Sequence, residues 1–334
     1  MQFLSPDDPR FRYEGRFDVA NPAGPVVIWQ GSRIRLDFSG PQLVLCFDGR
    51  QGQSFFDVAV DGVTAVLAVP VSAGQRWVYP EPLHDGWHQL TLFKRSEAAA
   101  GWARFAGVEL AAGTEAWRPA EPALRLRMEF FGDSITAGAC NEDGAVDQWE
   151  SYATHNNARS FAAMTAAAFG ADYRNIAVSG MGIVTGYVAV KAGQVWDRLY
   201  PEAGARRADL SAWQPNIALV NFGENDDSFT RNQGQPFPAE FAAGYAALVR
   251  AIRRAYPRAQ LVLLRGGMWG GAKSEPFREA WEQAVRELEA GDAGIRHFVF
   301  THWSENHPRV ADDRALADEL TAWLRTQDFI RTRR

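Results

Sequence analysis

Four residues in the C-terminal two thirds of the sequence carry groups that could catalyse acyl transfer. Ser134 lies in GDSIT, Gly180 in SGMG, Asn225 in GEND and His307 in ENHP. His307 could take the proton of the Ser134 hydroxyl and so make the serine a nucleophile. The amides of Ser134 and Gly180 and the Asn225 side chain could donate to the charge that develops on a carbonyl oxygen. A serine can also cap a helix, and an isolated histidine is often a surface residue, but the set in this order favours the chemistry.

The pattern around these residues predicts a parallel sheet that would bring them together. Short apolar runs alternate with stretches of helical periodicity, which indicates a five-stranded parallel sheet with helices on both faces. The expected strands are 127–131, 173–178, 217–222, 261–264 and 295–300, and the expected helices include 161–169, 241–255, 276–288 and 314–324. Ligands of such sheets bind beyond the carboxyl ends of the strands, where the four residues are expected.

The N-terminal third of the sequence has a different period. Between about residues 10 and 110, apolar and polar residues alternate in short runs, as in 33–38, 43–47, 55–60 and 89–93. Asp61-Gly62 separates two runs as a hairpin turn would, so we expect a β-sandwich. Pro119 and Pro122 indicate a linker, which predicts a sandwich domain over residues 1–122 and an α/β/α domain over residues 123–334.

Composition limits the partners that the protein can have. The net charge is -5 and no segment concentrates Lys and Arg, so nucleic acid is not an expected partner. No run approaches 18 apolar residues and the first residues do not resemble a signal peptide, so we expect a cytoplasmic protein without membrane contact. If the native N-terminus is missing, a secreted or periplasmic location is the alternative. Cys46 and Cys140 are expected to be free thiols.

We expect no cofactor and no metal, although three segments suggest one at first sight. The loop 180–186 has the spacing GxGxxxG, which departs from the dinucleotide fingerprint. The segment 267–274 is close to a phosphate loop, but Ala272 replaces its second glycine. His84 and His88 are separated by Asp-Gly-Trp, which favours a turn over a helical metal site.

The four catalytic segments, taken in order, resemble the SGNH hydrolases of the GDSL superfamily. This resemblance implies Ser134 as nucleophile, His307 as base, and the Ser134 amide, the Gly180 amide and the Asn225 side chain as oxyanion hole. The N-terminal segments YEGRFD, VIWQGSRIRLDFSG, VDG and WHQLTLFKRSE look like carbohydrate esterase family 2, whose members carry a jelly-roll domain before the SGNH domain. That family implies removal of acetyl groups from plant cell-wall polysaccharides such as xylan or glucomannan, with the 6-O position favoured.

The sequence departs from the SGNH pattern next to the histidine. The family places an aspartate three residues before the histidine, and this chain has Ser304 there. Because a base must be held in one orientation, another group must replace the acid. We expect a Ser-His dyad in which a backbone carbonyl accepts from His307 Nδ1. Glu305 is an alternative, and Asp312 and Asp313 are weaker ones.

Trp303, Trp269 and Asp226 are predicted to bind the carbohydrate substrate. Trp303 and Trp269 lie in expected loops at the carboxyl side of the sheet, where an aromatic face could stack on a sugar ring, and Trp149 lies in a similar loop. Trp303 is favoured, because it is close in sequence to His307. Asp226 could accept a hydrogen bond from a sugar hydroxyl. The alternatives are that the tryptophans pack the domain interface and that Asp226 lies in a solvated loop.

Two other functions remain open at this point. One is an SGNH esterase, lipase or thioesterase that acts on other acyl groups, including longer ones. The other is a non-catalytic glycan-binding protein. The sequence does not determine the oligomeric state, the polysaccharide or the acetylated hydroxyl.

Overall fold

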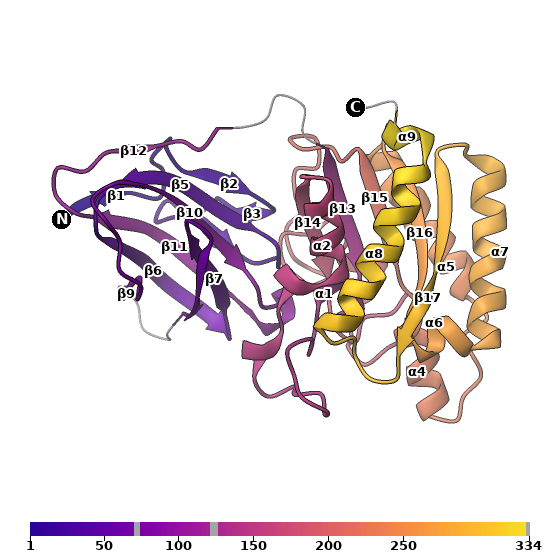
Figure 1. The fold of residues 1–334 in the computed structure, drawn as a ribbon. Helices are drawn as coiled ribbons and strands as arrows, with labels where there is room; N and C mark the ends of the chain where they lie inside the picture. The colour runs from indigo at the N-terminus through magenta and orange to yellow at the C-terminus, as the bar shows by residue number, and fades with distance from the viewer. Residues whose placement is uncertain (70–73, 121–125, 332–334) are drawn as a thin grey trace.

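The computed structural model describes residues 1–69, 74–120 and 126–331. An antiparallel β-sandwich built from strands β1 to β12 lies beside an α/β domain that begins at β13 (Figure 1). The expected domain boundary at residue 122 lies outside the described residues.

Two antiparallel sheets form the sandwich, each with six strands in the part of the chain that the structure describes. The first sheet contains β1 (Gln2–Leu4), β3 (Phe17–Asp18), β4 (Val26–Val27), β6 (Leu43–Gly52), β9 (Gln75–Val78) and β11 (Gly101–Leu110). The second contains β2 (Arg12–Glu14), β5 (Arg33–Ser39), β7 (Phe55–Val60), β8 (Val63–Ala68), β10 (Trp87–Lys94) and β12 (Ala116–Trp117). Alternate residues of β5 and β7 are buried between the sheets, as period-2 patterning requires.

The predicted hairpin turn at Asp61-Gly62 is confirmed. Val60 pairs with Val63, and the two residues between them have φ values of 53° and 86°. Both positions of such a two-residue turn need positive φ, which glycine and aspartate tolerate better than most residues.

The predicted five-stranded parallel sheet is also confirmed over the described residues. Its order is β14-β13-β15-β16-β17, so the first strand lies between the second and the third. The strands are β13 (Arg127–Gly132), β14 (Asp172–Ala177), β15 (Ile217–Asn221), β16 (Gln260–Met268) and β17 (Ile295–Ser304). The last two extend four residues beyond their expected ends, where Gly267 pairs with Trp303 and Met268 pairs with Ser304.

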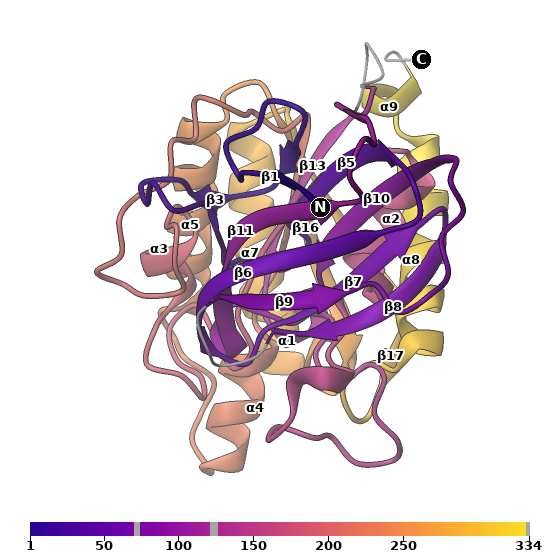
Figure 2. The ribbon, with the colours of Figure 1, turned by 90° about the vertical axis from the view of Figure 1, so that its left-hand side faces the viewer.

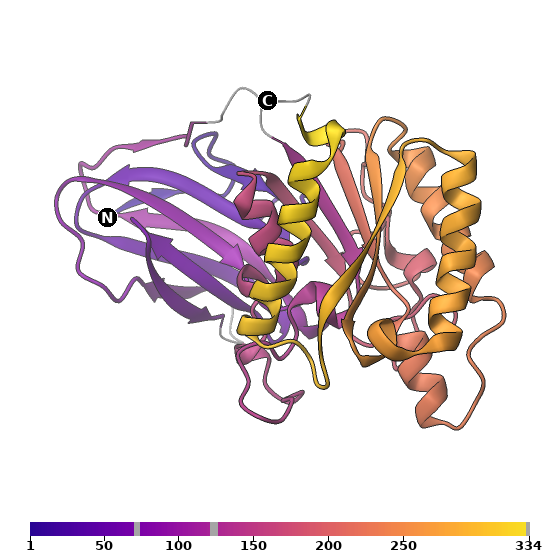
Figure 3. The ribbon, with the colours of Figure 1, turned by 45° about the vertical axis from the view of Figure 1, so that its right-hand side comes forward.

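Helices cover both faces of this sheet. Buried residues of α2 (Phe161–Ala168), α8 (Val310–Thr326) and α9 (Asp328–Arg331) pack on one face, and α8 crosses in front of it in Figure 3. Those of α3 (Ala192–Val195), α5 (Phe241–Ala255) and α7 (Glu275–Gly291) pack on the other. Three short helices, α1 (Ser134–Ala137), α4 (Glu224–Asn232) and α6 (Trp269–Lys273), begin close to the carboxyl ends of β13, β15 and β16. Within the described ranges, no helix combines the length and apolar character needed to span a bilayer.

Buried polar contacts join the sandwich to the α/β domain. Seen from its own side in Figure 2, the sandwich lies in front of the parallel sheet. Arg16 of the sandwich forms an ion pair with Glu129 of β13 at 2.9 Å, and both side chains are at most 2% exposed. Gln30 donates to Asn175 of β14 at 2.8 Å, and Trp29 packs in the same core as Ile176. The two domains therefore share part of one interior.

Candidate active site

The structure brings Ser134, Gly180, Asn225 and His307 together in one cleft of about 730 Å³. Each residue follows a strand of the parallel sheet: β13, β14, β15 and β17, respectively. Because parallel strands end at the same edge, four local motifs that are far apart in sequence converge there.

Ser134 is the first residue of α1 and is only 4% exposed. The Asp133 side chain caps this helix by accepting from the amide of Ile135 at 3.1 Å. A Cβ on Gly132 would lie 2.1 Å from Thr136 Oγ1, so only glycine allows the turn from strand to helix at this position. Ser134 Oγ lies 2.8 Å from His307 Nε2, which is hydrogen-bonding distance.

Asp147 orients His307. Its Oδ2 lies 2.7 Å from His307 Nδ1, and its Oδ1 pairs with Arg309 at 2.8 Å. With Nδ1 donating to this carboxylate, Nε2 is free to accept from Ser134. The prediction of a Ser-His dyad supported by a backbone carbonyl is therefore wrong, because a carboxylate occupies that position.

The other candidate orienters have different roles. Ser304 donates to the Asn306 carbonyl at 2.8 Å, and Asp312 pairs with His302 at 2.8 Å. Asp313 is fully buried and accepts from the amide of Phe161. Glu305 is exposed at the cleft, and the nitrogen that it would need on the histidine is bonded to Asp147.

Asp147 stays ionised over the range in which an imidazole can act as a base. Burial opposes its charge, but the hydrogen bonds and charges of His307 and Arg309 outweigh burial and lower the pKa of Asp147 to about 2. This pKa is lower than that of an aspartate in an unfolded chain, about 3.9. The ionised Asp147 carboxylate therefore stabilises the fold fully above about pH 4. The stabilisation is lost as the pH falls towards 2.

The sequence offered no signal for Asp147. It lies in an irregular segment, 160 residues before His307, and no motif surrounds it. An acidic residue in a loop is ordinarily solvated, so only the folded arrangement distinguishes it from other aspartates.

Hydrogen bonds to residues of the two neighbouring loops orient the Asn225 side chain. Its Nδ2 donates to Asp133 Oδ2 at 3.0 Å and to the Met181 carbonyl at 3.2 Å. Burial, together with the nearby Glu224 carboxylate, raises the pKa of Asp133 to about 8. Gly180 has a φ of 78°, a conformation that favours glycine.

The prediction that Asp226 binds a sugar hydroxyl is wrong. Asp226 is completely buried, and its carboxylate accepts from the amides of Ile183, Val184 and Thr185 at 2.7 to 3.0 Å. Its role is to fold the loop that follows Gly180, and the three amides of that loop are thereby engaged by a carboxylate of the chain itself.

The tryptophans divide into two groups. Trp269 lines the cleft, and the Arg231 guanidinium lies 4.3 Å from the centre of its ring. Trp149 lines the cleft as well and meets the His307 ring edge to face at 5.0 Å. Trp303 is not among the residues that line the cleft. It belongs to β17, and the Lys273 ammonium lies 5.0 Å from the centre of its ring. The preference for Trp303 as a sugar-stacking residue is therefore wrong.

The segment that resembles a phosphate loop already holds an anion of the chain itself. The Glu224 carboxylate accepts from the amides of Gly270 and Gly271 at 2.9 and 2.8 Å. Burial raises the pKa of Glu224, although these two hydrogen bonds oppose the rise. A phosphate group cannot occupy the same amides.

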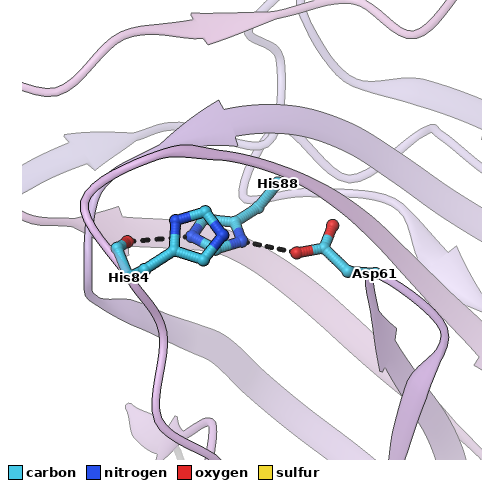
Figure 4. A group of neighbouring side chains, drawn as sticks. All are labelled: Asp61, His84 and His88. Atoms are coloured by element: carbon cyan, nitrogen blue, oxygen red, sulfur yellow. Dashed lines mark hydrogen bonds and ion pairs between the residues drawn. The ribbon is translucent and has the colours of Figure 1, made fainter.

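The histidines considered as a metal site form a hydrogen-bonded turn with Asp61 (Figure 4). His88 Nδ1 lies 2.6 Å from Asp61 Oδ2, and His88 Nε2 lies 3.0 Å from the His84 carbonyl. His84 Nδ1 accepts from the amide of Gly86 at 2.7 Å. Since three of the four ring nitrogens are engaged, this geometry favours a structural role for the cluster.

A serine bonded to an imidazole that is itself held by a carboxylate, at the edge of a sheet of order 2-1-3-4-5, defines a carboxylic ester hydrolase of the SGNH type. The chain belongs to the GDSL-like lipase/acylhydrolase family, whose model matches residues 130–324. Residues 13–120 match a second model, that of the carbohydrate esterase 2 N-terminal domain.

Named relatives and a solved structure match most of this chain. The chain is 30% identical to the cellulase/esterase CelE of Acetivibrio thermocellus over an alignment of 333 residues. The alignment covers 96% of this chain but only 40% of that protein. It is 28% identical to the acetylxylan esterase / glucomannan deacetylase of Cellvibrio japonicus, over 95% of this chain and 91% of that protein. A solved family two carbohydrate esterase from Clostridium thermocellum, in complex with cellohexaose, superposes with a TM-score of 0.85 at 28% identity, over 94% and 98% of the two chains.

Proposed function

We propose that this protein removes acetyl groups from plant cell-wall polysaccharides, with Ser134 as nucleophile, His307 as general base and Asp147 as the residue that orients the base. The observation that carries the proposal is the pair of short contacts of His307, 2.8 Å to the serine hydroxyl and 2.7 Å to the carboxylate. The substrates named for relatives that match most of this chain support the carbohydrate part of the proposal.

The reaction proceeds in two acyl transfers. His307 Nε2 takes the Ser134 proton while Oγ attacks the acetyl carbonyl, and the resulting tetrahedral oxyanion collapses to an acetyl-serine. The sugar alkoxide leaves with the proton from His307. Water, deprotonated by the same nitrogen, then attacks the acetyl-serine and releases acetate and the free serine.

The oxyanion would be held by the amides of Ser134 and Gly180 and by Asn225. Nδ2 of Asn225 has two hydrogens, and the shorter of its two bonds fixes it to Asp133. The other hydrogen points at the Met181 carbonyl, 3.2 Å away, and would be shared between that carbonyl and the oxyanion as charge develops. Asp133 thus keeps the donor close to where it is needed.

Replacing Asn225 with alanine is expected to lower kcat by about 10²- to 10³-fold with little change in KM, as for the loss of one oxyanion donor. The interaction is made mainly in the transition state, so ground-state binding is spared. Steady-state kinetics on p-nitrophenyl acetate measure the effect, with thermal unfolding as a check of the fold. A rise in KM at constant kcat would assign Asn225 to substrate binding and contradict its role in the oxyanion hole.

The shape and lining of the cleft favour a small acyl group on a sugar. Polar and aromatic side chains dominate the lining, and its aliphatic residues are only Ala99, Val188 and Met268 among the described residues. A long acyl chain needs a continuous apolar channel, whereas a sugar needs aromatic faces and hydrogen-bonding groups. Trp149 and Trp269 would supply the faces.

The depth of the serine favours an acetyl group at the 6-O position. Ser134 is 4% exposed, so an ester on an exocyclic carbon reaches it more easily than an ester attached directly to the ring. Xylose units have no exocyclic carbon, whereas the hexoses of glucomannan do. The proposal therefore ranks acetylated glucomannan above acetylated xylan.

The purified protein is expected to release acetate from acetylated glucomannan faster than from acetylated xylan. Acetate release is measured enzymatically, and proton NMR of the residual polysaccharide shows which acetyl signals disappear first. Equal loss of ring and 6-O acetyl groups would contradict the positional preference.

Esters of longer acids provide the matched control for the acyl group. We expect kcat/KM for p-nitrophenyl acetate to exceed that for the octanoate by at least about tenfold, since a pocket without apolar extension gains nothing from added methylenes. A preference for octanoate would indicate a lipase or thioesterase instead.

A further inference from the structure

A carboxylate from the sandwich reaches the cleft of the α/β domain. Glu97 lies between β10 and β11, is 1% exposed, and lines the cleft together with Ser134 and His307. A buried carboxylate is costly unless it is paired or hydrogen-bonded, so its contacts indicate its role.

One oxygen of Glu97 holds the loop that follows β14. Oε2 accepts from the backbone amide of Ser179 at 3.0 Å. Ser179 directly precedes Gly180, whose amide is proposed to face the oxyanion. The position of that amide therefore depends on a residue of the other domain.

The second oxygen of Glu97 faces a buried histidine. Oε1 lies 3.6 Å from Nδ1 of His155, and Nε2 of His155 lies 2.9 Å from the carbonyl of Gln148. The contact with the carbonyl requires a proton on Nε2, and the separation of Nδ1 from Glu97 is that of an ion pair, longer than a hydrogen bond. Burial opposes a charge on the ring, but Glu97, together with the Gln148 carbonyl and Asp143, outweighs burial and raises the pKa of His155.

Other titratable groups also surround this histidine. Cys140 Sγ lies 3.4 Å from Nε2, the Tyr152 ring lies 4.7 Å from the imidazole, and Asp143 acts through its charge. None of the three replaces Glu97 as the group that faces Nδ1.

The carbonyl that His155 binds lies next to the residue that orients the base. Gln148 follows Asp147 and precedes Trp149, whose ring contacts both His155 and His307 at 5.4 and 5.0 Å. The hydrogen bond from His155 thus fixes the backbone directly beside Asp147.

The rest of this segment, residues 141–157, is anchored to the sandwich as well. Arg95 donates to the carbonyl of Ala153 at 3.0 Å and also pairs with Glu142. Gln53 donates to the carbonyl of Glu150 at 2.8 Å and accepts from the amide of Tyr152 at 3.1 Å. The segment that carries Asp147 therefore takes much of its conformation from the sandwich.

We propose that Glu97 and His155 act as a pair of positioning residues, which set the Gly180 amide through Ser179 and the Asp147 carboxylate through Gln148. The sandwich is then part of the catalytic machinery. This inference rests on the proposed function, because it assigns the pair to the geometry of the acyl-transfer site.

Glu97→Gln and His155→Gln are each expected to lower kcat on p-nitrophenyl acetate by about tenfold while KM stays within about twofold, because small displacements of catalytic groups reduce turnover more than binding. The double variant is expected to be no slower than the slower single variant, because the two residues act as one unit. Glu115→Gln, an exposed glutamate of the same domain, is the matched control.

A second measurement separates positioning from a general loss of stability. The downfield proton of the Asp147–His307 hydrogen bond, followed by proton NMR well below the Tm of each variant, is expected to broaden or shift in Glu97→Gln and to be unchanged in Glu115→Gln. If Glu97→Gln does not fold, His155→Gln is subjected to the same two measurements.

The inference fails if Glu97→Gln retains the kcat of the Glu115→Gln control, if the losses of the two single variants multiply in the double variant, or if the NMR signal is unchanged. The wild type is the reference for all of these. A wild type that does not hydrolyse the ester refutes the proposed function, whereas an active wild type with an equally active Glu97→Gln variant refutes only the positioning pair.

Discussion

Replacing Ser134 with alanine is expected to lower kcat on p-nitrophenyl acetate by about 10⁴- to 10⁶-fold, the range seen when the nucleophile of a serine hydrolase is removed. Without Oγ no acetyl-enzyme forms, and the remaining donors can only assist direct attack by water. Spectrophotometric assay with a large excess of variant enzyme measures the residual rate. Addition of a chelator is expected to leave the wild-type rate unchanged, because no step of the proposed mechanism uses a metal.

Polysaccharide binding by the same variant is the control. The Ser134 side chain is small and lies deep in the cleft, so affinity electrophoresis in acetylated glucomannan is expected to show retardation similar to that of the wild type. Substantial esterase activity in Ser134→Ala would exclude the serine as nucleophile. A wild type that binds polysaccharide without hydrolysing any ester would instead favour a glycan-binding protein.

Replacing Asp147 with asparagine is expected to lower kcat/KM by about 10²- to 10⁴-fold, the upper limit being that of the corresponding change in a Ser-His-Asp triad. An asparagine amide can donate to His307 Nδ1 and so favours the tautomer whose Nε2 carries the proton and cannot accept from Ser134. Because the pKa of Asp147 is lowered to about 2, the wild-type carboxylate is ionised at every pH above about 4. The loss is therefore expected to be nearly constant in a pH profile of kcat/KM above about pH 8, where an imidazole is ordinarily neutral with either residue beside it.

Ser304→Ala is the matched control for this prediction. Ser304 stands where the family pattern has its acid, but its hydroxyl donates to the Asn306 carbonyl and not to the histidine. We expect its kcat/KM to stay within about twofold of the wild type, as for a substitution outside the reacting groups. An Asp147→Asn variant as active as Ser304→Ala would show that the histidine needs no carboxylate, and would restore the dyad.

The sequence predicted the part of the site that short motifs encode. Ser134, Gly180, Asn225 and His307 each follow a strand directly, and the strands are recognisable as apolar runs. Parallel strands then align their carboxyl ends without any further information. The spacing of apolar residues also predicted the order of the two domains, because it changes from strict alternation in the sandwich to alternating strand and helix patterns in the α/β domain.

Asp147 could not be found in this way. Its position depends on a segment without regular structure, anchored by side chains of the other domain such as Arg95 and Gln53. Contacts of this kind leave no periodic trace, because each is a single pairing between residues far apart in sequence.

The two errors in the substrate site also have physical causes. The strand expected to end at Phe300 continues to Ser304, so Trp303 pairs with Gly267 in the sheet and does not lie in a loop. Asp226 lies in the first turn of α4, where its carboxylate meets the free amides of the loop after Gly180. Local sequence does not reveal which neighbours compete for a polar side chain.

The ion pair between Arg16 and Glu129 has a consequence for how this protein can be divided. Glu129 lies at 0% exposure on β13, an interior strand between β14 and β15, and the guanidinium 2.9 Å from it belongs to the other domain. An α/β domain without the sandwich would leave this carboxylate without its counter-ion, and would either keep an unpaired buried charge, at a cost on the order of 3 to 5 kcal/mol, or admit water to the inner part of β13. The sandwich is therefore needed for the stability of the α/β domain. We expect that the two domains must be expressed and engineered together, as one chain.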